Sequence, residues 1–437
     1  MGHSHSTSGT QPNVASKVAI IGAGLSGLAL SLALSLQGIE STIYESRDSP
    51  LNIGGAVMLS PNALKVLEAL GVFSRIERRG YKFEYLDFRD TVGNLTERYE
   101  FGNQAKYGYT GLRVFRTVLI EELLHATQSH QHCHKIHLAF SAKFARVISD
   151  GHEGVTWELA DGTRQTSTLL IGADGIHSTV RRYIYPDLET TFIGQAGITA
   201  AVPTEQLKLP ADYYIPVTIT SPVGAFVIAP QEPDGSRVLI GRQRRMPATD
   251  RAGWDEIHAH PERQIEFMRS DGDQFPEIVR NATSTIQPDS INIWPFFIVP
   301  KLDSWVSDKG NGRVIILGDA AHAIPPTAGQ GINQAFEDVY MLALILGRTK
   351  DAYEDASKTT VPLESSLKFW QQYRQSRVDK VLDLNKQIDL RRLSAKDLEG
   401  PSSYGGGGPE RREFDLDWLY RPDFAVVIDQ FMSSVSA

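Results

Sequence analysis

Gly22-Ala23-Gly24-Leu25-Ser26-Gly27 comes directly after the apolar run Val18 to Ile21 and opens a leucine-rich stretch that stops at Gly38. The spacing predicts a strand, a tight turn and a helix. A second predicted strand, Ser41 to Tyr44, ends at Glu45. This order of elements is the pattern of a dinucleotide-binding unit in a parallel α/β sheet.

Each glycine of the motif has its own predicted task. Gly22 permits the tight turn, Gly24 lets the backbone approach a pyrophosphate, and Gly27 lets the helix pack close to the strand. The pyrophosphate would lie beside Leu25 and Ser26, because free N–H groups and the helix dipole favour an anion at a helix N-terminus.

Glu45 follows Gly27 at close to the spacing of about 20 residues expected for the carboxylate that binds a ribose 2′-hydroxyl. An acid at this place disfavours a 2′-phosphate. A glycine-rich turn without a ligand would not account for the strand, helix and acid together. A membrane helix over Val18 to Ile39 is disfavoured by its four glycines and by the strand that follows.

A second segment, Ala173-Asp174-Gly175, follows Arg164 to Gly172, which we expect to form one strand. An aspartate that caps a helix and a glycine that turns the chain would explain Asp174 and Gly175. This interpretation does not explain why Ser178 and Arg181 follow at the start of the next helix.

A third segment, Gly318-Asp319, follows a predicted buried strand from Arg313 to Leu317. Asp319 can accept a hydrogen bond from a cofactor hydroxyl, and Pro325-Pro326 stiffens the loop that comes next. A helix predicted over Asn333 to Leu346 begins just after Gly331, so its N-terminus can stabilise negative charge on a bound group.

Together these segments resemble the single-component FAD-dependent monooxygenases of the aromatic-hydroxylase type. This family includes para-hydroxybenzoate and salicylate hydroxylases, fungal enzymes of secondary metabolism and the tetracycline-inactivating monooxygenases. Asp174-Gly175 is similar to the motif that contacts FAD and NAD(P)H, and Gly318-Asp319 to the motif that holds the ribityl chain. The resemblance runs from about Lys17 to Gln387.

Further matches lie at Gly54-Gly55-Ala56 with Ser60 to Ala63, at Arg116, and at Asp417 to Tyr420. The residues that the resemblance implies for FAD binding are Gly22, Gly24, Leu25, Ser26, Gly27, Glu45, Ser46, Arg47, Gly55, Ala56, Arg116, Val147, Asp174, Gly175, Asp319, Gly331, Ile332 and Asn333.

The resemblance implies an enzyme that uses FAD, O₂ and NADH or NADPH to hydroxylate an electron-rich small molecule, phenolic or polycyclic aromatic. Oxygen would be transferred from a flavin C4a-hydroperoxide, and the protein would supply position and dryness. Epoxidation, Baeyer–Villiger oxidation, and an FAD-linked reductase or oxidase remain alternatives. A halogenase is disfavoured because Asn292 to Pro300 lacks the Trp-x-Trp-x-Ile-Pro motif, and a non-catalytic FAD-binding module would need neither Asp174-Gly175 nor the Pro325-Pro326 loop.

The catalytic candidates are the Pro326 carbonyl, by analogy with the family, and Arg242 and Arg244. The two arginines are two residues apart in a predicted strand, so their side chains lie on the same face of the sheet. We predict that this face is exposed to solvent. No firm catalytic base is named. The candidates for substrate contact are Phe226, Gln231, Trp294 and Phe296.

We expect an α/β fold with a discontinuous, Rossmann-like FAD-binding domain, an inserted β-sheet substrate domain and a long C-terminal helix. The expected substrate domain has strands near 213–220, 224–228 and 236–242 and a helix over 259–275. The expected ranges are 1–16 for a disordered N-terminus; 17–80, 105–185 and 290–350 for FAD binding; 81–104 and 186–289 for the substrate domain; 351–400 for a helical region; and 401–437 for a linker and tail.

Composition narrows the other functional classes. The net charge of −8 over 437 residues disfavours nucleic acid as a partner. Cys133 is the only cysteine, which excludes an intramolecular disulfide, and the histidines around it lack a second cysteine or carboxylate, so no metal site is predicted. No signal peptide or membrane span is evident, so a cytoplasmic location is expected. The oligomeric state is left open.

Overall fold

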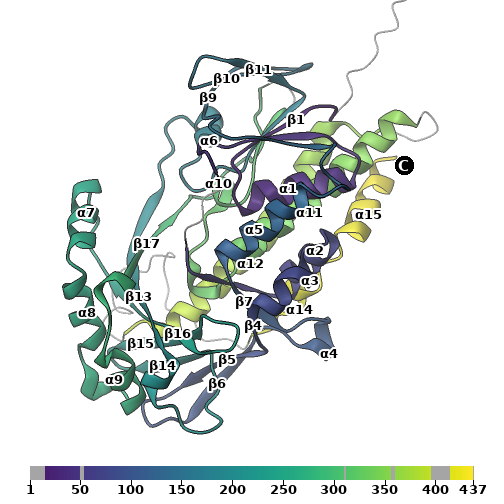
Figure 1. The fold of residues 1–437 in the computed structure, drawn as a ribbon. Helices are drawn as coiled ribbons and strands as arrows, with labels where there is room; N and C mark the ends of the chain where they lie inside the picture. The colour runs from purple at the N-terminus through teal and green to yellow at the C-terminus, as the bar shows by residue number, and fades with distance from the viewer. Residues whose placement is uncertain (1–14, 50–53, 310–311, 356–359, 395–413, 437) are drawn as a thin grey trace, which may run out of the picture.

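The computed structural model describes residues 15–49, 54–309, 312–355, 360–394 and 414–436 (Figure 1). The predicted α/β fold is confirmed. Most of the expected disordered N-terminus and the glycine run at 405–408 lie outside the described residues.

A five-stranded parallel sheet carries the predicted dinucleotide unit. Its order is β18 (Val314–Ile316), β12 (Leu169–Gly172), β1 (Val18–Ile21), β2 (Ser41–Tyr44) and β8 (Ile136–Ala139). In a parallel sheet the carboxyl ends of all strands lie at one edge. The three motif segments follow β1, β12 and β18, so the topology brings them together at that edge.

Three helices lie beside this sheet, with the first packed against the other two (Figure 1). They are α1 (Leu25–Leu36), α5 (Arg116–Thr127) and α11 (Gly331–Glu354). The helix predicted from Asn333 therefore begins earlier and continues further, because nearly every turn of α11 buries apolar side chains.

The prediction of one strand over Arg164 to Gly172 is wrong. β11 (Arg164–Ser167) belongs to an antiparallel sheet with β10 (Gly154–Leu159) and β9 (Phe144–Gly151), whereas β12 belongs to the parallel sheet. The chain changes sheets at Thr168, whose backbone N–H and hydroxyl both donate to the Lys17 carbonyl, at 2.8 and 2.9 Å.

The larger sheet, called here the substrate sheet, has seven strands. In order they are β17 (Asn292–Ile298), β13 (Thr191–Pro203), β16 (Arg237–Arg245), β15 (Gly224–Pro230), β14 (Val217–Ser221), β5 (Tyr85–Arg89) and β6 (Leu95–Glu100). β17 pairs with β13, so the sheet extends past the expected domain boundary at residue 289.

Short helices cover one face of the substrate sheet: α7 (Arg251–Ala259), α8 (Pro261–Arg269) and α9 (Glu277–Ser284). The predicted continuous helix over 259–275 is wrong. Pro261 has no backbone N–H and favours a helix start, so α7 ends before it and α8 begins with it.

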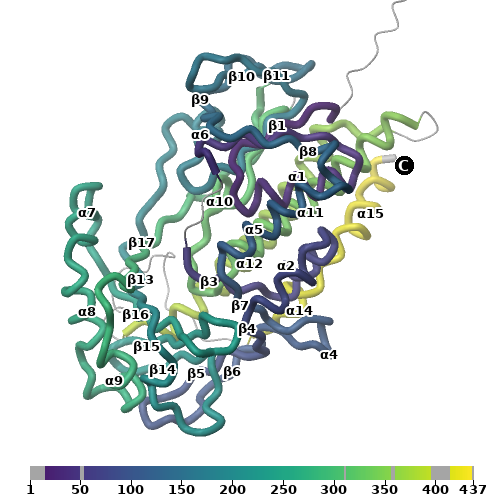
Figure 2. Tube along the Cα trace, viewed as in Figure 1, coloured from purple at the N-terminus to yellow at the C-terminus, as the bar shows by residue number. Residues whose placement is uncertain are grey.

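A small sheet of β3 (Ala56–Leu59), β7 (Gly111–Phe115) and β4 (Gly80–Phe83) stands between the parallel sheet and the substrate sheet. α12 (Leu363–Arg392) follows α11 and reaches the substrate sheet at β14 and β15, as Figure 2 shows. The remaining helical segments include α2 (Pro61–Ala69), α3 (Phe73–Ile76), α4 (Gln104–Tyr107), α6 (Thr179–Ile184) and α10 (Asp319–His322).

The described part of the C-terminal region, residues 414–436, packs on the core. α14 (Asp417–Tyr420) buries Leu419, and α15 (Phe424–Ser436) packs on α11 through Phe424 and Ile428. Within the described ranges, no helix combines the length and apolar character needed to cross a bilayer.

Buried charges join α11 to α12. Glu337 accepts hydrogen bonds from Arg374 and from Arg377, whose Nε lies 2.6 Å away. Asp338 accepts from Arg374 Nε at 2.8 Å, from His322 Nε2 at 2.5 Å, and from the backbone N–H of Gly318 at 3.0 Å. The interhelical cluster therefore also holds the third motif segment in place.

Candidate functional site

The three glycines of the first segment differ in what surrounds them. A Cβ on Gly27 would lie 1.9 Å from the Gly22 oxygen, and a Cβ on Gly22, whose φ is +104°, would lie 2.7 Å from the Ala173 oxygen. A Cβ on Gly24 would meet no atom within 4 Å. Protein packing thus requires glycine at residues 22 and 27, while Gly24 borders open space at the N-terminus of α1, where no side chain caps the helix. Such a cradle fits a pyrophosphate.

Glu45 lies at the bottom of this cradle. Its carboxylate accepts hydrogen bonds from the backbone N–H groups of Ala23, at 2.9 Å, and Arg47, at 3.0 Å. Burial raises the pKa of Glu45, but these hydrogen bonds outweigh burial and hold the pKa below its usual value. Glu45 is therefore ionised beside the glycines, while Ser46 and Arg47 remain exposed.

Replacing Glu45 with Gln is expected to weaken FAD binding about tenfold, because a neutral amide loses the charge-assisted hydrogen bonds. Titration of the apoprotein with FAD, followed by quenching of flavin fluorescence, measures the change. The exposed Glu40, changed to Gln, is the control. Equal FAD affinity in both variants would contradict the role of Glu45.

The second segment caps α6 and contacts the third segment. Asp174 Oδ2 accepts from the backbone N–H groups of Thr179 and Val180, at 2.7 and 3.2 Å, and the Ser178 hydroxyl accepts from the Arg181 N–H at 2.8 Å. Arg181 Nη1 donates to the Ala320 carbonyl at 2.9 Å. Asp174 and Ser178 therefore cap the N-terminus of α6, and Arg181 joins the second segment to the third.

Asp319 and Arg116 lie close enough to interact electrostatically. Asp319 is exposed to solvent, yet the protein packed around it raises its pKa, with His322 and then Arg116 acting in the opposite direction. Arg116 Nε is buried and has no partner among the described residues, and its Cδ lies 3.2 Å from where a Cβ on Gly54 would be. A bound cofactor would satisfy this donor.

The N-terminus of α11 has no side-chain cap. The Asn333 side chain is already engaged, since its oxygen accepts from the Ser60 N–H at 3.0 Å and its Nδ2 donates to the carbonyls of Met58 and Gly329, at 3.0 and 2.7 Å. Gly331 and Ile332 are partly exposed. These residues can therefore offer backbone N–H groups, and not the Asn333 amide, to a ligand.

The loop formed by residues 323–330, called here the proline loop, is braced by α12. Asn385 Oδ1 accepts from the Ala328 N–H at 2.7 Å, and Arg392 Nη1 donates to the Thr327 carbonyl at 3.0 Å. Pro326, which precedes both braced residues, is exposed, and its carbonyl accepts from the Gly329 N–H at 2.9 Å. The brace fixes the Pro326 carbonyl without covering the residue.

Residues 15–351, a span that contains all three segments, match the family model described as the FAD binding domain. The chain belongs to that family. It is an FAD-dependent monooxygenase that takes NAD(P)H as co-substrate, and the predicted cofactor is confirmed.

Curated relatives and solved structures agree with this assignment. The chain is 29% identical to hispidin-3-hydroxylase of Neonothopanus nambi, over 83% of this chain and 86% of the relative. It is 27% identical to 3-amino-4-hydroxybenzoate 2-monooxygenase PtmB3 of Streptomyces platensis, over 76% and 79%. HpxO of Klebsiella pneumoniae, solved with FAD and uric acid, shares the fold with a TM-score of 0.68 at 23% identity, over 87% and 90% of the two chains.

The substrate sheet of this monooxygenase has two different faces. On the outer face, Phe226 packs in the apolar core with Met268 and Val279 of α8 and α9. On the inner face, the Thr218 hydroxyl accepts from Arg392 Nη2 at 3.4 Å, and the same guanidinium holds the proline loop.

Arg242 and Arg244 lie on the outer face, so the structure removes the basis for a catalytic role. Arg242 is 4% exposed, which makes the preference for a solvent-facing side chain wrong. Its Nη1 donates to the carbonyls of Phe267 and Ser270 at 2.9 and 2.8 Å, and Arg244 stacks 4.8 Å from the Phe267 ring. Phe226 is likewise a core residue, with its ring 6.2 Å from Phe275.

Trp294 and Phe296 lie on the inner face. Trp294 pairs with Gly197, and the Phe296 ring lies 3.4 Å from where a Cβ on Gly197 would be. Gln231 is at the end of β15, with its oxygen bound to Arg113. Val147 is a core residue of β9 and pairs with Trp157.

Sequence reasoning missed Arg113, Arg392 and the inner-face amide Gln195, whose buried oxygen has no partner among the described residues. Side chains alternate between the two faces along a strand, and this alternation could have placed Gln195 on the face opposite the outer-face residues. No sequence signal joins Arg392 to the proline loop.

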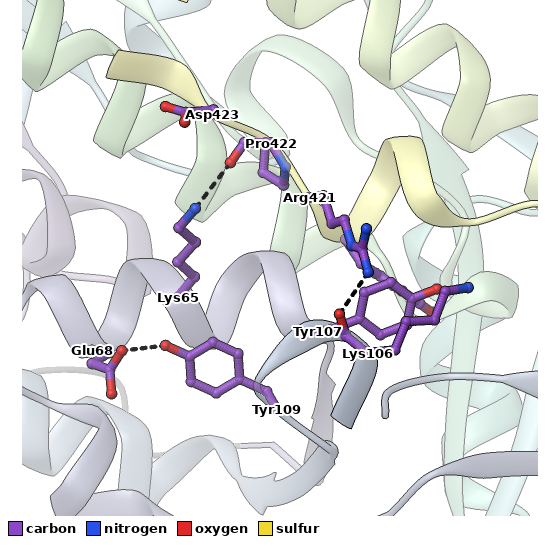
Figure 3. A pocket seen from close by; sticks show the side chains of 9 residues that line it. Lys65, Glu68, Lys106, Tyr107, Tyr109, Arg421, Pro422 and Asp423 are labelled. Atoms are coloured by element: carbon purple, nitrogen blue, oxygen red, sulfur yellow. Dashed lines mark hydrogen bonds between the residues drawn. The ribbon is translucent and has the colours of Figure 1, made fainter. Parts of the chain in front are cut away.

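A surface pocket of about 400 Å³ lies between α2, α4 and the C-terminal segment (Figure 3). Its polar groups bond to one another: Tyr109 to Glu68, Lys65 Nζ to the Pro422 carbonyl at 3.3 Å, and Arg421 to the Lys106 carbonyl at 2.7 Å. The contacts of Pro422 and Arg421 attach the C-terminal segment to α2 and α4.

Proposed function

We propose that the enzyme hydroxylates an electron-rich aromatic small molecule held between the proline loop and the inner face of the substrate sheet. The observation that carries this proposal is the Arg392 brace, which joins the Thr327 carbonyl to Thr218 of that face. When bound, FAD takes a hydride from NAD(P)H and activates O₂ for transfer to carbon. The residues of the chain bind, orient and exclude water.

Each part of the cleft has a distinct proposed role. Gly24 and the N-terminus of α1 hold the pyrophosphate, Glu45 a ribose hydroxyl, and Asp319 a ribityl hydroxyl. Backbone N–H groups at the start of α11 stabilise negative charge on the flavin ring. The Pro326 carbonyl directs the oxygen to be transferred.

Two aromatic residues form the proposed dry wall. Phe296 is 3% exposed and Trp294 is 51% exposed on the inner face. A bound ring would cover Trp294 and remove water from the reacting atoms. Hispidin-3-hydroxylase and the 3-amino-4-hydroxybenzoate 2-monooxygenase both bear the names of hydroxylated aromatic substrates, which supports the proposed class.

The deciding experiment supplies the holoenzyme with NAD(P)H, isotopically labelled O₂ and a panel of phenols and acidic enols. One labelled oxygen atom in the product for each NAD(P)H consumed is expected. Full recovery of the oxygen as H₂O₂, with no labelled product from any compound, would overturn the proposal and favour an oxidase or reductase.

Trp294→Ala is expected to lower the yield of hydroxylated product per NAD(P)H several-fold with little loss of stability, because the residue is half exposed in the free enzyme. Comparing H₂O₂ release with product formation measures this coupling. Trp254→Ala on α7, whose ring packs 5.4 Å from Phe192, is the control for loss of a tryptophan. If Trp294→Ala forms as much hydroxylated product per NAD(P)H as the wild type, Trp294 does not help to exclude water from the site.

A further inference from the structure

A buried guanidinium without a carboxylate partner lies where β7 meets the substrate sheet. Arg113 is 6% exposed. Its Nε donates to the Pro230 carbonyl and its Nη2 to the Gln231 oxygen at 2.8 Å, and both acceptors are neutral. Burial lowers the pKa of Arg113 to about 10. Buried charges in proteins are normally paired, so this arrangement needs an explanation.

The other strongly buried arginines of the described chain each have a carboxylate nearby. Ion pairs join Arg242 to Asp271, Arg374 to Glu337 and Asp338, Arg377 to Glu337, and Arg391 to Glu97. Arg181 and Arg313 interact with Asp174 and Asp150 at longer range. For Arg113, burial alone accounts for the lowered pKa, and no described acid forms an ion pair with it.

Arg113 projects away from the core of the FAD-binding domain. Its neighbours in β7, Leu112 and Val114, are 1% and 0% exposed and belong to that core. Because side chains alternate along a strand, Arg113 points to the opposite face of the small sheet. Its bonds to Pro230 and Gln231 place that face against the end of β15.

A row of side chains across the small sheet locates the guanidinium further. Arg113 pairs with Met58 on one side and with Tyr81 on the other. Met58 lies 3.6 Å from where a Cβ on Gly329 of the proline loop would be, and Tyr81 lies 3.2 Å from the corresponding atom on Gly235, in the turn after β15. Arg113 is therefore in the middle of a row that runs from the proline loop to the substrate sheet.

The guanidinium retains unused donors. Of its five N–H groups, the two described bonds use one on Nε and one on Nη2. Nη1 has no hydrogen-bond partner among the described residues, and it is not among the enclosed polar atoms that lack partners. It therefore borders accessible space and can receive an acceptor from a ligand.

We propose that Arg113 binds an anionic oxygen group of the aromatic substrate, a ring carboxylate or an ionised enol. This inference rests on the proposed function and narrows its substrate class. The planar fork of a guanidinium suits a planar two-oxygen acceptor. A ligand anion also supplies the missing counter-charge, so binding is favoured over that of a neutral analogue of the same shape.

The test measures binding to the oxidised holoenzyme without reductant. Salicylate is compared with salicylamide, benzoate with benzamide, and 4-hydroxycoumarin with 4-methoxycoumarin, by flavin absorbance difference and calorimetry. The wild type is expected to bind at least one anion about tenfold or more tightly than its neutral partner. The carboxylates and the acidic enol separate the two sources of the anionic group.

Two variants assign the preference to Arg113. Arg113→Gln is expected to abolish it by weakening anion binding, with the neutral analogue bound as in the wild type. Gln231→Glu keeps the guanidinium and the shape of its surroundings but supplies an internal counter-ion, so it is expected to abolish the preference as well. Gln231→Glu keeps the proposal testable if Arg113→Gln fails to fold.

Several outcomes would overturn the inference: no preference for any anion in the wild type, an unchanged preference in both variants, or loss of FAD from an Arg113→Gln variant that still folds, which would assign the guanidinium to the flavin. Failure of the proposed function looks different. Anions would then bind through Arg113 while labelled oxygen never enters a product.

Discussion

Arg374→Met is expected to lower the free energy of unfolding by about 3–5 kcal/mol, because breaking a buried ion pair leaves carboxylates without full compensation. Glu337, Asp338 and Arg374 are each 0% exposed. Glu337 would retain Arg377 and Asp338 would retain His322, but the bonds from Arg374 to both acids would be lost. Urea unfolding followed by circular dichroism measures the change.

Lys368→Met, on the exposed side of α12, is the matched control and is expected to stay within about 0.5 kcal/mol of the wild type. Equal unfolding free energies for the two variants would show that the buried cluster contributes no net stability. Because Asp338 also accepts from the Gly318 N–H, Arg374→Met should weaken FAD binding too, whereas Lys368→Met should not.

The same cluster predicts an acid-sensitive fold. Burial raises the pKa of Glu337, but Arg377 and Arg374 outweigh it and hold the pKa below the ordinary 4.5; His322 and Arg374 do the same for Asp338 below 3.8. Groups with lowered pKa values stabilise the fold above their ordinary values, and the stabilisation is lost as pH falls through the lowered ones. Acid unfolding should therefore begin at higher pH in Arg374→Met.

Gly27→Ala is expected to disrupt both stability and FAD binding, because its Cβ would lie 1.9 Å from the Gly22 oxygen. Helix α1 would have to move away from β1, and overpacking of this kind costs about 1–3 kcal/mol. A shift of that size in the cradle corresponds to roughly a tenfold or greater loss of FAD affinity. Thermal unfolding of the apoprotein and FAD titration measure the two effects separately.

Gly24→Ala is the matched comparison. Its Cβ would meet no protein atom within 4 Å, so the apoprotein should unfold as the wild type does. The added methyl group would occupy space assigned to the pyrophosphate, so FAD affinity should still fall. Wild-type FAD affinity in Gly24→Ala would contradict that assignment, whatever the result for Gly27→Ala.

Much of the cofactor-binding half could be predicted because its signals are local. The strand, turn and helix around Gly22 to Gly27 depend on residues that are neighbours in sequence, and glycine is required where backbones approach closely. The strand boundary near residue 168 and the domain boundary near residue 289 could not be predicted, because each depends on a distant element. The chain passes from one sheet to another at Thr168, where Lys17 accepts its hydrogen bonds, and β17 joins the substrate sheet by pairing with β13.

In the substrate sheet, even a correct prediction from residue spacing did not identify the functional face. Arg242 and Arg244 lie on the same face of the substrate sheet, as their spacing predicts. The spacing does not reveal which face of the sheet is covered by helices. α8 and α9 come after those strands and cover the outer face, which makes Arg242 structural and leaves Trp294 and Phe296 for the inner face.

The sequence alone was enough to assign the FAD family and the order of the nucleotide motifs, and to predict which residues a pyrophosphate and a ribose would contact. The reason is that those contacts are made by backbone geometry within short segments. Three-dimensional packing was needed to find that Asp338 holds Gly318, that Arg392 braces Thr327, and that Arg113 is buried without an acid. Burial and charge compensation depend on residues far apart in the chain, and packing alone brings them together.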